Sequence, residues 1–191
     1  MPVNKLTATK RGKAAIAAVL AVTIGGVVTL ATGEKIPPAV VLADKYVAGP
    51  WEGLKTAAYW DADGKVWTVC RGETKGVKKG DRYTVAQCEA MFVDRLNLDF
   101  YKPIIKCAPA LVGAPVSVQA AMLSGAYNFG VTAWCKSTAA ARVRAKDFRA
   151  ACVAQTAFNR AGGRVLPGLV NRREMGDAQR IGEAELCLSG L

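Results

Sequence analysis

Two acidic residues and one hydroxyl residue are spaced in a way that suits acid–base chemistry. Glu52 and Asp61 lie nine positions apart, and Thr68 follows in a run of residues typical of a β-strand. Two carboxyl groups held on opposite sides of a sugar cleave a glycosidic bond, with one of them acting as the general acid. The pattern therefore indicates glycoside hydrolysis, and Gly53 and Gly64 mark breaks between the elements that would carry these side chains.

The sequence contains no histidine, and this absence excludes several classes of enzyme. A Ser-His-Asp triad or a Cys-His pair would have no catalytic base. A zinc peptidase that binds its metal through histidine would have no ligands. We therefore expect neither a metal ion nor a cofactor, and we expect catalysis to depend on carboxylate, lysine, tyrosine or cysteine side chains.

The chain is strongly basic, with 26 Lys and Arg residues against 15 Asp and Glu residues and a net charge of +11. A basic protein is attracted to polyanions such as nucleic acid, anionic lipid or a bacterial wall, although an ordinary solvated surface explains the same charge. The basic residues are spread through the sequence, and no zinc-finger or RNA-binding motif is present. We therefore expect no nucleic-acid partner.

The cysteines favour an exported protein with disulfide bonds. No two of them have the CxxC spacing of a metal site. An even number in an exported chain predicts three disulfides, each of which contributes about 2–4 kcal/mol to stability. The alternative is a cytosolic protein with buried free thiols. The six residues are Cys70, Cys88, Cys107, Cys135, Cys152 and Cys187.

Residues 14–32 contain no charged side chain and follow a basic N-terminal flank. A helix of this length nearly matches the thickness of a bilayer core. The basic flank predicts that the N-terminus stays in the cytoplasm while the rest of the chain is exported. The flanking residues are Lys5, Lys10, Arg11 and Lys13.

The uncharged stretch is rich in Ala, Gly and Thr, so its insertion into a membrane is expected to be only slightly favourable. One interpretation is a signal peptide that is cleaved at the small residues 31–33. A second is an uncleaved segment that leaves the membrane slowly. A third is a buried helix of the soluble domain, which the basic flank and the following Pro37 and Pro38 disfavour.

The rest of the sequence predicts an α+β domain with a small β element near its start. Residues 65–70 alternate and are rich in β-formers, which indicates a strand or hairpin. Residues 116–127 are apolar almost all round, as in a central buried helix. Further helices are predicted at residues 39–52, 85–99 with Thr84 as N-cap, 137–144, 147–159 and 171–188, the last with one polar face, and a loop at 162–168.

Three blocks of sequence resemble the phage T4-type lysozymes, glycoside hydrolase family 24. The first is WEGLKTAAYWDADGKVWTVCRGET at residues 51–74, which resembles the family motif of Glu, eight residues, Asp, five residues and Thr. The second is AYNFG at 126–130 with WCKST at 134–138, and the third is GGRVLPGLVNRRE at 162–174.

The resemblance implies a lysozyme-like fold with a small N-terminal β lobe and a larger helical lobe. It implies a muramidase that hydrolyses the β-1,4 bond between N-acetylmuramic acid and N-acetylglucosamine in bacterial peptidoglycan. Glu52 matches the general acid, Asp61 the second carboxylate, and Thr68 the hydroxyl that helps to place the attacking water. Arg172 matches an arginine that lies against the acid. Glu73 adds a third carboxylate near the cleft, where many relatives have histidine.

The second carboxylate departs from the family motif in its spacing. Six residues separate Asp61 from Thr68, whereas the family usually has five. We expect the extra residue in the turn at residues 63–65. Asp61 and Asp63 both remain candidates for the second carboxylate, and the spacing from Glu52 favours Asp61.

With its N-terminal segment, the chain resembles the signal-arrest-release endolysins of phages that infect Gram-negative bacteria. The resemblance implies a membrane segment at residues 1–35, a linker at 36–44 and a catalytic domain at 45–191. It implies a monomer whose N-terminus is cytoplasmic and whose catalytic domain is held at the host inner membrane and then released to the periplasm. Activation by thiol exchange with the anchor is excluded, because residue 61 is Asp and residues 14–32 contain no Cys.

Six cysteines allow fifteen pairings. Cys70 follows the predicted strand and Cys88 lies on the next helix, so we expect a local bridge between them. The helix order of the family implies the other two pairs, Cys107–Cys135 and Cys152–Cys187.

Two other functions fit parts of the sequence. A lytic transglycosylase uses one carboxylic acid and no attacking water, and it leaves a 1,6-anhydro end on its product. A cationic protein that disrupts membranes or binds the wall without catalysis would keep its lytic effect after Glu52 is replaced.

Overall fold

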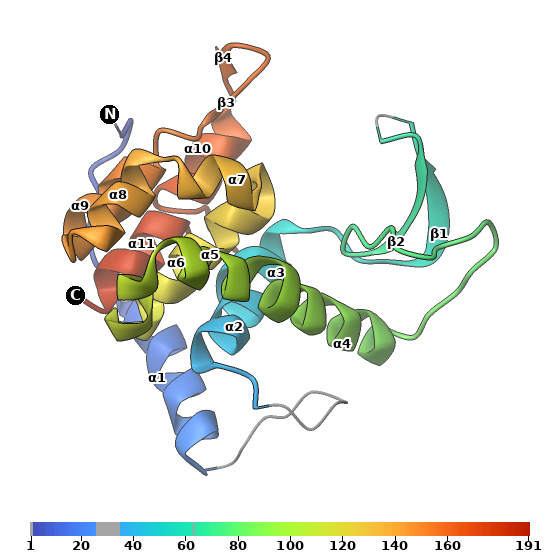
Figure 1. Cartoon of the computed structure of the whole chain (residues 1–191), viewed down its shortest axis with the longest axis horizontal. Coiled ribbons are helices and arrows are strands. Elements are labelled where there is room, and N and C mark those ends of the chain that lie inside the picture. Colours follow the sequence, from blue (N-terminus) through green and yellow to red (C-terminus); the bar gives the residue numbers. More distant parts are fainter. Residues whose placement is uncertain (1, 26–34, 63) are drawn as a thin grey trace.

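The structure is a computed structural model that describes residues 2–25, 35–62 and 64–191. Packed helices form most of the molecule, and one β-hairpin stands out from them as a small lobe (Figure 1). The elements are α1 (Lys10–Gly25), α2 (Pro38–Leu42), η1 (Ala43–Val47), α3 (Ala48–Trp51), β1 (Lys55–Asp61), β2 (Val66–Cys70), α4 (Val85–Arg95), η2 (Leu96–Tyr101), α5 (Lys102–Cys107), η3 (Pro109–Gly113), α6 (Val116–Phe129), α7 (Val131–Cys135), α8 (Thr138–Arg144), α9 (Phe148–Gln155), β3 (Arg160–Ala161), β4 (Arg164–Val165), α10 (Pro167–Arg173) and α11 (Glu183–Ser189).

The β lobe is the antiparallel pair of β1 and β2. It has a small core of its own around Val69, Cys70 and Cys88. The Cys70–Cys88 disulfide fastens the end of β2 to α4. An isolated antiparallel β-bridge between the backbones of Ala57 and Arg82 joins β1 to the chain before α4. The predicted strand is thus part of a hairpin that is held against the helix that follows it.

One continuous helical segment joins the β lobe to the helical lobe. It begins at Thr84, whose hydroxyl accepts a hydrogen bond from the backbone N–H of Gln87, while the Gln87 side chain accepts one from the backbone N–H of Thr84. This reciprocal capping box satisfies two N–H groups of the first turn and confirms the predicted N-cap. The segment continues from α4 through the π-helical η2 into α5.

Helix α6 lies at the centre of the helical lobe, as the sequence predicted. Its residues from 117 to 126 are all buried, and it packs against α2, α9 and α11. The packing is close, because a Cβ atom added to Gly125 would lie 2.5 Å from the side chain of Gln155. Most of these buried residues are apolar, as a helix surrounded by other helices requires.

All six cysteines form disulfides, in the three pairs that were expected. One lies at the edge of the β lobe, and the other two join α5 to α7 and α9 to α11. The pairs are Cys70–Cys88, Cys107–Cys135 and Cys152–Cys187.

The C-terminal part differs from the single helix predicted at residues 171–188. The chain forms α10, then an irregular segment, then α11. Gly176 has φ +71°, and a Cβ atom there would lie 2.0 Å from the carbonyl oxygen of Arg180, so only glycine fits this close approach. Every residue of α11 is buried, including the acidic residues of its expected polar face, Glu183 and Glu185.

The segment predicted as a loop before α10 contains a short hairpin. Strands β3 and β4 pair antiparallel, with Arg160 opposite Val165 and Ala161 opposite Arg164. The turn between them is made by residues 162–163, two glycines that both have positive φ. Two consecutive glycines between strands are a hairpin signal, so a hairpin lies where only a loop was predicted.

Residues 36–44, expected as a linker, instead belong to the helical lobe. They contain α2 and the start of η1, and Ala39, Val40 and Leu42 are buried in the main core. Pro38 occupies the first turn of α2, where its missing N–H is not needed. This apolar run therefore packs beside α6 and does not connect two separate bodies.

The N-terminal segment packs against the C-terminal end of the helical lobe. Helix α1 contacts α11, where a Cβ atom added to Gly12 would lie 2.3 Å from Ser189 Oγ. Ala15 and Val19 are buried there. This is the arrangement of a helix buried against the domain, which the sequence disfavoured.

No helix in the described ranges is both long enough and apolar enough to cross a membrane. The membrane segment predicted at residues 14–32 extends into residues 26–34, which lie outside the described part of the chain.

Candidate active site

Glu52 lies at the point where α3 ends and the chain turns toward the β lobe. It is the C-cap of α3 and has extended backbone dihedrals, φ −96° and ψ 134°. Its side chain is 24% exposed, and Arg172 Nη1 donates a hydrogen bond to Glu52 Oε1 at 2.7 Å. The carboxyl group therefore faces solvent on one side and a buried cation on the other.

The arginine that contacts Glu52 belongs to a buried charge cluster. Arg172 Nε lies 3.4 Å from Glu183 Oε1, and Arg173 Nη1 donates to the same oxygen. Glu183 also accepts hydrogen bonds from the hydroxyl of Ser124 at 2.7 Å and from Gln155 Nε2 at 2.8 Å. Burial lowers the pKa of Arg173, and the negative charge of Glu183 opposes that effect. Glu183 thus holds both arginines in place from α11.

Asp61 and Thr68 lie on the β hairpin and share one of its faces. Asp61 pairs with Val66, and Tyr59 pairs with Thr68. Residues directly opposite each other, and residues two apart on one strand, point to the same side of a sheet. Asp61 and Thr68 therefore lie on the same face of the hairpin, on either side of the turn in which the extra residue was expected.

The immediate surroundings of the two residues differ. Asp61 is partly exposed, and its Oδ1 accepts a hydrogen bond from the backbone N–H of Gly64 at 3.3 Å. Thr68 is only 2% exposed, and its hydroxyl lies 3.4 Å from the carbonyl oxygen of Val66. The alternative candidate, Asp63, lies outside the described residues.

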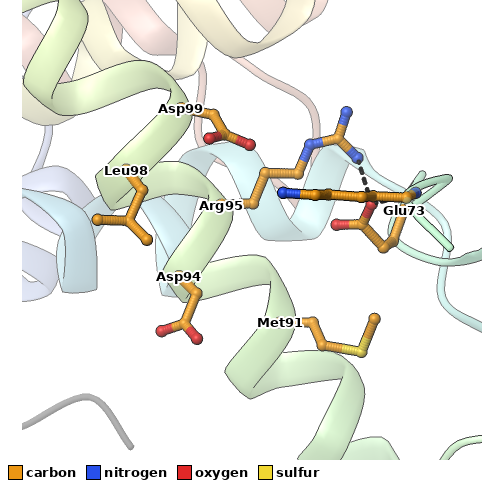
Figure 2. A pocket seen from close by; sticks show the side chains of 7 residues that line it. Glu73, Met91, Asp94, Arg95, Leu98 and Asp99 are labelled. Atoms are coloured by element: carbon orange, nitrogen blue, oxygen red, sulfur yellow. Dashed lines mark hydrogen bonds and ion pairs between the residues drawn. The ribbon is translucent and has the colours of Figure 1, made fainter. Parts of the chain in front are cut away.

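Glu73 follows the β hairpin and forms an ion pair with α4. Its Oε1 accepts from the backbone N–H of Thr74 at 2.8 Å and of Lys75 at 2.7 Å, and it lies 3.6 Å from Arg95 Nη1. Figure 2 shows Arg95 reaching from α4 toward Glu73 across a pocket of about 280 Å³. The pocket is lined by Glu73, Lys75, Met91, Asp94, Arg95, Leu98 and Asp99.

Tyr127 on α6 is influenced by the charges of both the Glu52–Arg172 and the Glu73–Arg95 ion pairs. Its hydroxyl donates to the carbonyl oxygen of Arg71 at 2.6 Å. Burial raises the pKa of Tyr127 to about 12, and the negative charge of Glu52 adds to the rise. Glu73 acts in the same direction, whereas Arg95 and Arg172 oppose it. The phenol therefore feels both the Glu52 and the Glu73 carboxylates, and it remains a hydrogen-bond donor at neutral pH.

We expect alkaline titration to reveal a phenol with a pKa of about 12, and we expect Tyr127→Phe to remove it. The folded-state pKa lies above the ordinary value of 10.0, so the stabilisation is complete below pH 10 and is lost as the pH rises toward about 12. Ultraviolet absorbance of tyrosinate measures this titration. Tyr83→Phe in the β lobe is the control, which should keep the transition at about 12, and a transition near 10 for Tyr127 would contradict its burial.

Sequence reasoning found Glu52 and Arg172, and the structure brings these two together. It missed Arg173, although that residue is adjacent to Arg172 in the third block. Tyr127 lies within the AYNFG block, so the resemblance of that block to the family could have identified it. Glu183 had no signal, because its partners lie in α6, α9 and α10.

The sequence matches a known family over most of its length. A family model described as phage lysozyme matches residues 49–176. The SAR-endolysin of Enterobacteria phage P21 is 33% identical over 159 residues, which cover 80% of this chain and 89% of the relative. The SAR-endolysin of Pseudomonas phage phiKMV is 36% identical over 132 residues, which cover 64% of this chain and 76% of the relative.

Solved structures show the same fold. The muramidase domain of SpmX from Asticaccaulis excentricus is 27% identical with a TM-score of 0.58, covering 81% of this chain and 97% of that domain. The active form of P1 phage endolysin Lyz has a TM-score of 0.63 at 22% identity, covering 98% of this chain and 97% of that one, and it supports the fold alone. With a family model that matches more than half of its residues, the chain belongs to the phage lysozyme family.

Proposed function

We propose that the protein is a phage endolysin that hydrolyses the β-1,4 bond between N-acetylmuramic acid and N-acetylglucosamine in peptidoglycan. The observation that carries this proposal is the partly exposed Glu52 carboxyl group in contact with the buried Arg172. Membership of the phage lysozyme family and the muramidase neighbour support the same chemistry.

Glu52 acts as the general acid in the proposed mechanism. It gives a proton to the glycosidic oxygen as the bond to the leaving sugar breaks. The carboxylate that remains is negatively charged, and Arg172, 2.7 Å away, stabilises that charge. Because Arg172 is itself fixed by Glu183, this stabilisation is in place before the substrate binds.

Asp61 supplies the second carboxylate. It orients the attacking water with the help of Thr68 and supports the positive charge that develops on the sugar. The two carboxyl groups come from different elements, since Glu52 ends α3 and Asp61 ends β1. A separation of about 6.5–9.5 Å between them leaves room for a water molecule and gives an inverted product.

Analysis of the reaction products tests the proposed reaction. Purified protein acting on peptidoglycan should release fragments with a reducing N-acetylmuramic acid end. Fragments that end in 1,6-anhydro sugar would show a lytic transglycosylase instead. Lysis of cells without any new sugar ends would show a cationic membrane-active or wall-binding protein.

We also propose that residues 1–35 hold the protein at the host inner membrane, with the N-terminus in the cytoplasm and a monomeric catalytic domain in the periplasm, until the segment leaves the bilayer. The names of the SAR-endolysin relatives support this proposal. The docked α1 then represents the released form, in which Arg11 reaches the buried Glu185 at 2.6 Å.

N-terminal sequencing of the protein from the membrane fraction tests whether this segment is retained. A chain that begins at Met1 or Pro2 supports arrest followed by release. A chain that begins at Glu34 would show a cleaved signal peptide and would contradict the proposal.

A further inference from the structure

A short loop at the end of β2 holds Arg71 in a fixed place. Backbone hydrogen bonds of 2.9 Å run in both directions between Val69 and Glu73 and close this loop. Cys70 has φ +57°, a left-handed conformation that is uncommon for a residue with a side chain. The disulfide from Cys70 to Cys88 fastens the loop to α4. The backbone that carries Arg71 is therefore held from two sides.

The side chain of Arg71 reaches across to the helix that carries Glu52. Its Nη1 donates to the carbonyl oxygen of Gly49 and to that of Glu52, the second at 3.0 Å. These carbonyl groups lie at the C-terminal end of α3, where a cation is favoured, and that of Gly49 also accepts the backbone N–H of Glu52. Arg71 thus caps α3 at the residue proposed as the general acid.

The backbone of Arg71 is also tied to the helical lobe. Its carbonyl oxygen accepts the hydrogen bond from the hydroxyl of Tyr127, and its guanidinium lies over the ring of Phe92 with 5.6 Å between them. One residue of the β lobe therefore contacts α3, α4 and α6. Arg71 therefore links the C-terminal end of α3, where Glu52 lies, to α4 and α6.

These contacts are poorly suited to stability alone. Within the described part of the chain, Arg71 Nε is buried and has no hydrogen-bond partner. A buried N–H without a partner costs free energy, so the guanidinium is a costly way to join two elements. A long apolar side chain would cover the ring of Phe92 without that cost, but it could not bind the carbonyl oxygens of Gly49 and Glu52.

We propose that Arg71 is a positioning residue for Glu52, an inference that rests on the proposed role of Glu52 as the general acid. Arg71 holds the main chain of Glu52 from the β lobe, and Arg172 holds its carboxyl group from α10. The acid is thereby fixed at both ends. Because the guanidinium of Arg71 is engaged by the carbonyl oxygens of Gly49 and Glu52, its proposed effect is on the rate of bond cleavage and not on substrate binding.

The test compares Arg71→Met and Arg71→Lys with the parent chain, using soluble peptidoglycan fragments so that kcat and KM are measured separately. Arg71→Met should lower kcat by about 10–100-fold, because small displacements of a catalytic group have effects of this size. KM should change by less than about threefold, since no contact with the substrate is lost. Arg71→Lys keeps one donor for the carbonyl oxygens and should recover part of kcat.

Arg82→Met is the matched control, because it removes the same charge from an exposed position in the same lobe. It should keep the kcat of the parent chain. Circular dichroism and melting temperature must show that each variant is folded at the assay temperature, and if Arg71→Met fails this check, Arg71→Lys decides the question.

A parental kcat in a folded Arg71→Met, or a loss of kcat equal to that in Arg82→Met, would overturn the proposal. A rise in KM at unchanged kcat would also overturn it, because Arg71 would then act in binding. These results leave the proposed function standing. Failure of that function shows separately, as a parent chain that releases no reducing ends.

Discussion

Glu52→Gln should lower the rate of peptidoglycan hydrolysis by about 10²–10⁴-fold, the contribution of a positioned general acid. Glutamine has nearly the shape of glutamic acid and can still accept the hydrogen bond from Arg172 Nη1. It has no proton to give to the leaving oxygen. Turbidity loss of a wall suspension, together with the count of new reducing ends, measures the effect.

Glu89→Gln is the matched control for Glu52→Gln, because Glu89 is exposed on α4. It should keep the parental rate. A Glu52→Gln variant that is folded and hydrolyses the wall at the parental rate would remove Glu52 from the mechanism. Asp61→Asn is a second comparison, and a parental rate there would remove Asp61 in the same way.

The residues that sequence could place were those whose partners lie nearby or are fixed by a family motif. Thr84 and Gln87 are three positions apart, so their reciprocal cap could be predicted from local chemistry. Glu52 and Arg172 lie 120 positions apart, and only the family motif linked them. In the structure the contact joins a side chain of α10 to the C-cap residue of α3.

Residues 36–44 and 171–188 show what local patterns do not determine. The apolar run around Val40 and Leu42 fits a linker after a membrane segment and fits a buried helix equally well, and tertiary packing against α6 decided the outcome. Glu183 and Glu185 belong to the polar face that was predicted for the final helix. They are buried because their cationic partners come from α10 and from the N-terminal segment.

The candidate site also contains both kinds of residue, those that the sequence identified and those whose positions depend on tertiary packing. The sequence proposed the carboxylates and the arginine, but it gave no means of finding the residues that hold them. Arg71 and Tyr127 meet through a backbone carbonyl group, a contact that depends on the shape of the loop after β2. Glu183 acts through two neighbouring arginines. Support of this kind depends on the three-dimensional arrangement of elements that are far apart in the chain.

Arg173→Met should be the most destabilising of the substitutions considered, with a loss of about 3–5 kcal/mol, because it breaks a buried ion pair from one side. Arg173 and Glu183 are each 1% exposed. Glu52 and Glu183 together balance Arg172 and Arg173 in this cluster, so the variant leaves one buried negative charge without its counterion. For a chain of this length, the melting temperature should fall by roughly 6–20 °C.

Arg142→Met is the control, because it removes an arginine from an exposed ion pair. Arg142 lies 3.7 Å from Asp147, and both side chains are about half exposed, so its loss should cost about 1 kcal/mol or less. The double variant Arg173→Met with Glu183→Gln removes both charges and should recover most of the lost stability, since an amide at position 183 can still accept from Ser124. A single Arg173→Met variant as stable as Arg142→Met would show that the buried cluster does not depend on charge balance.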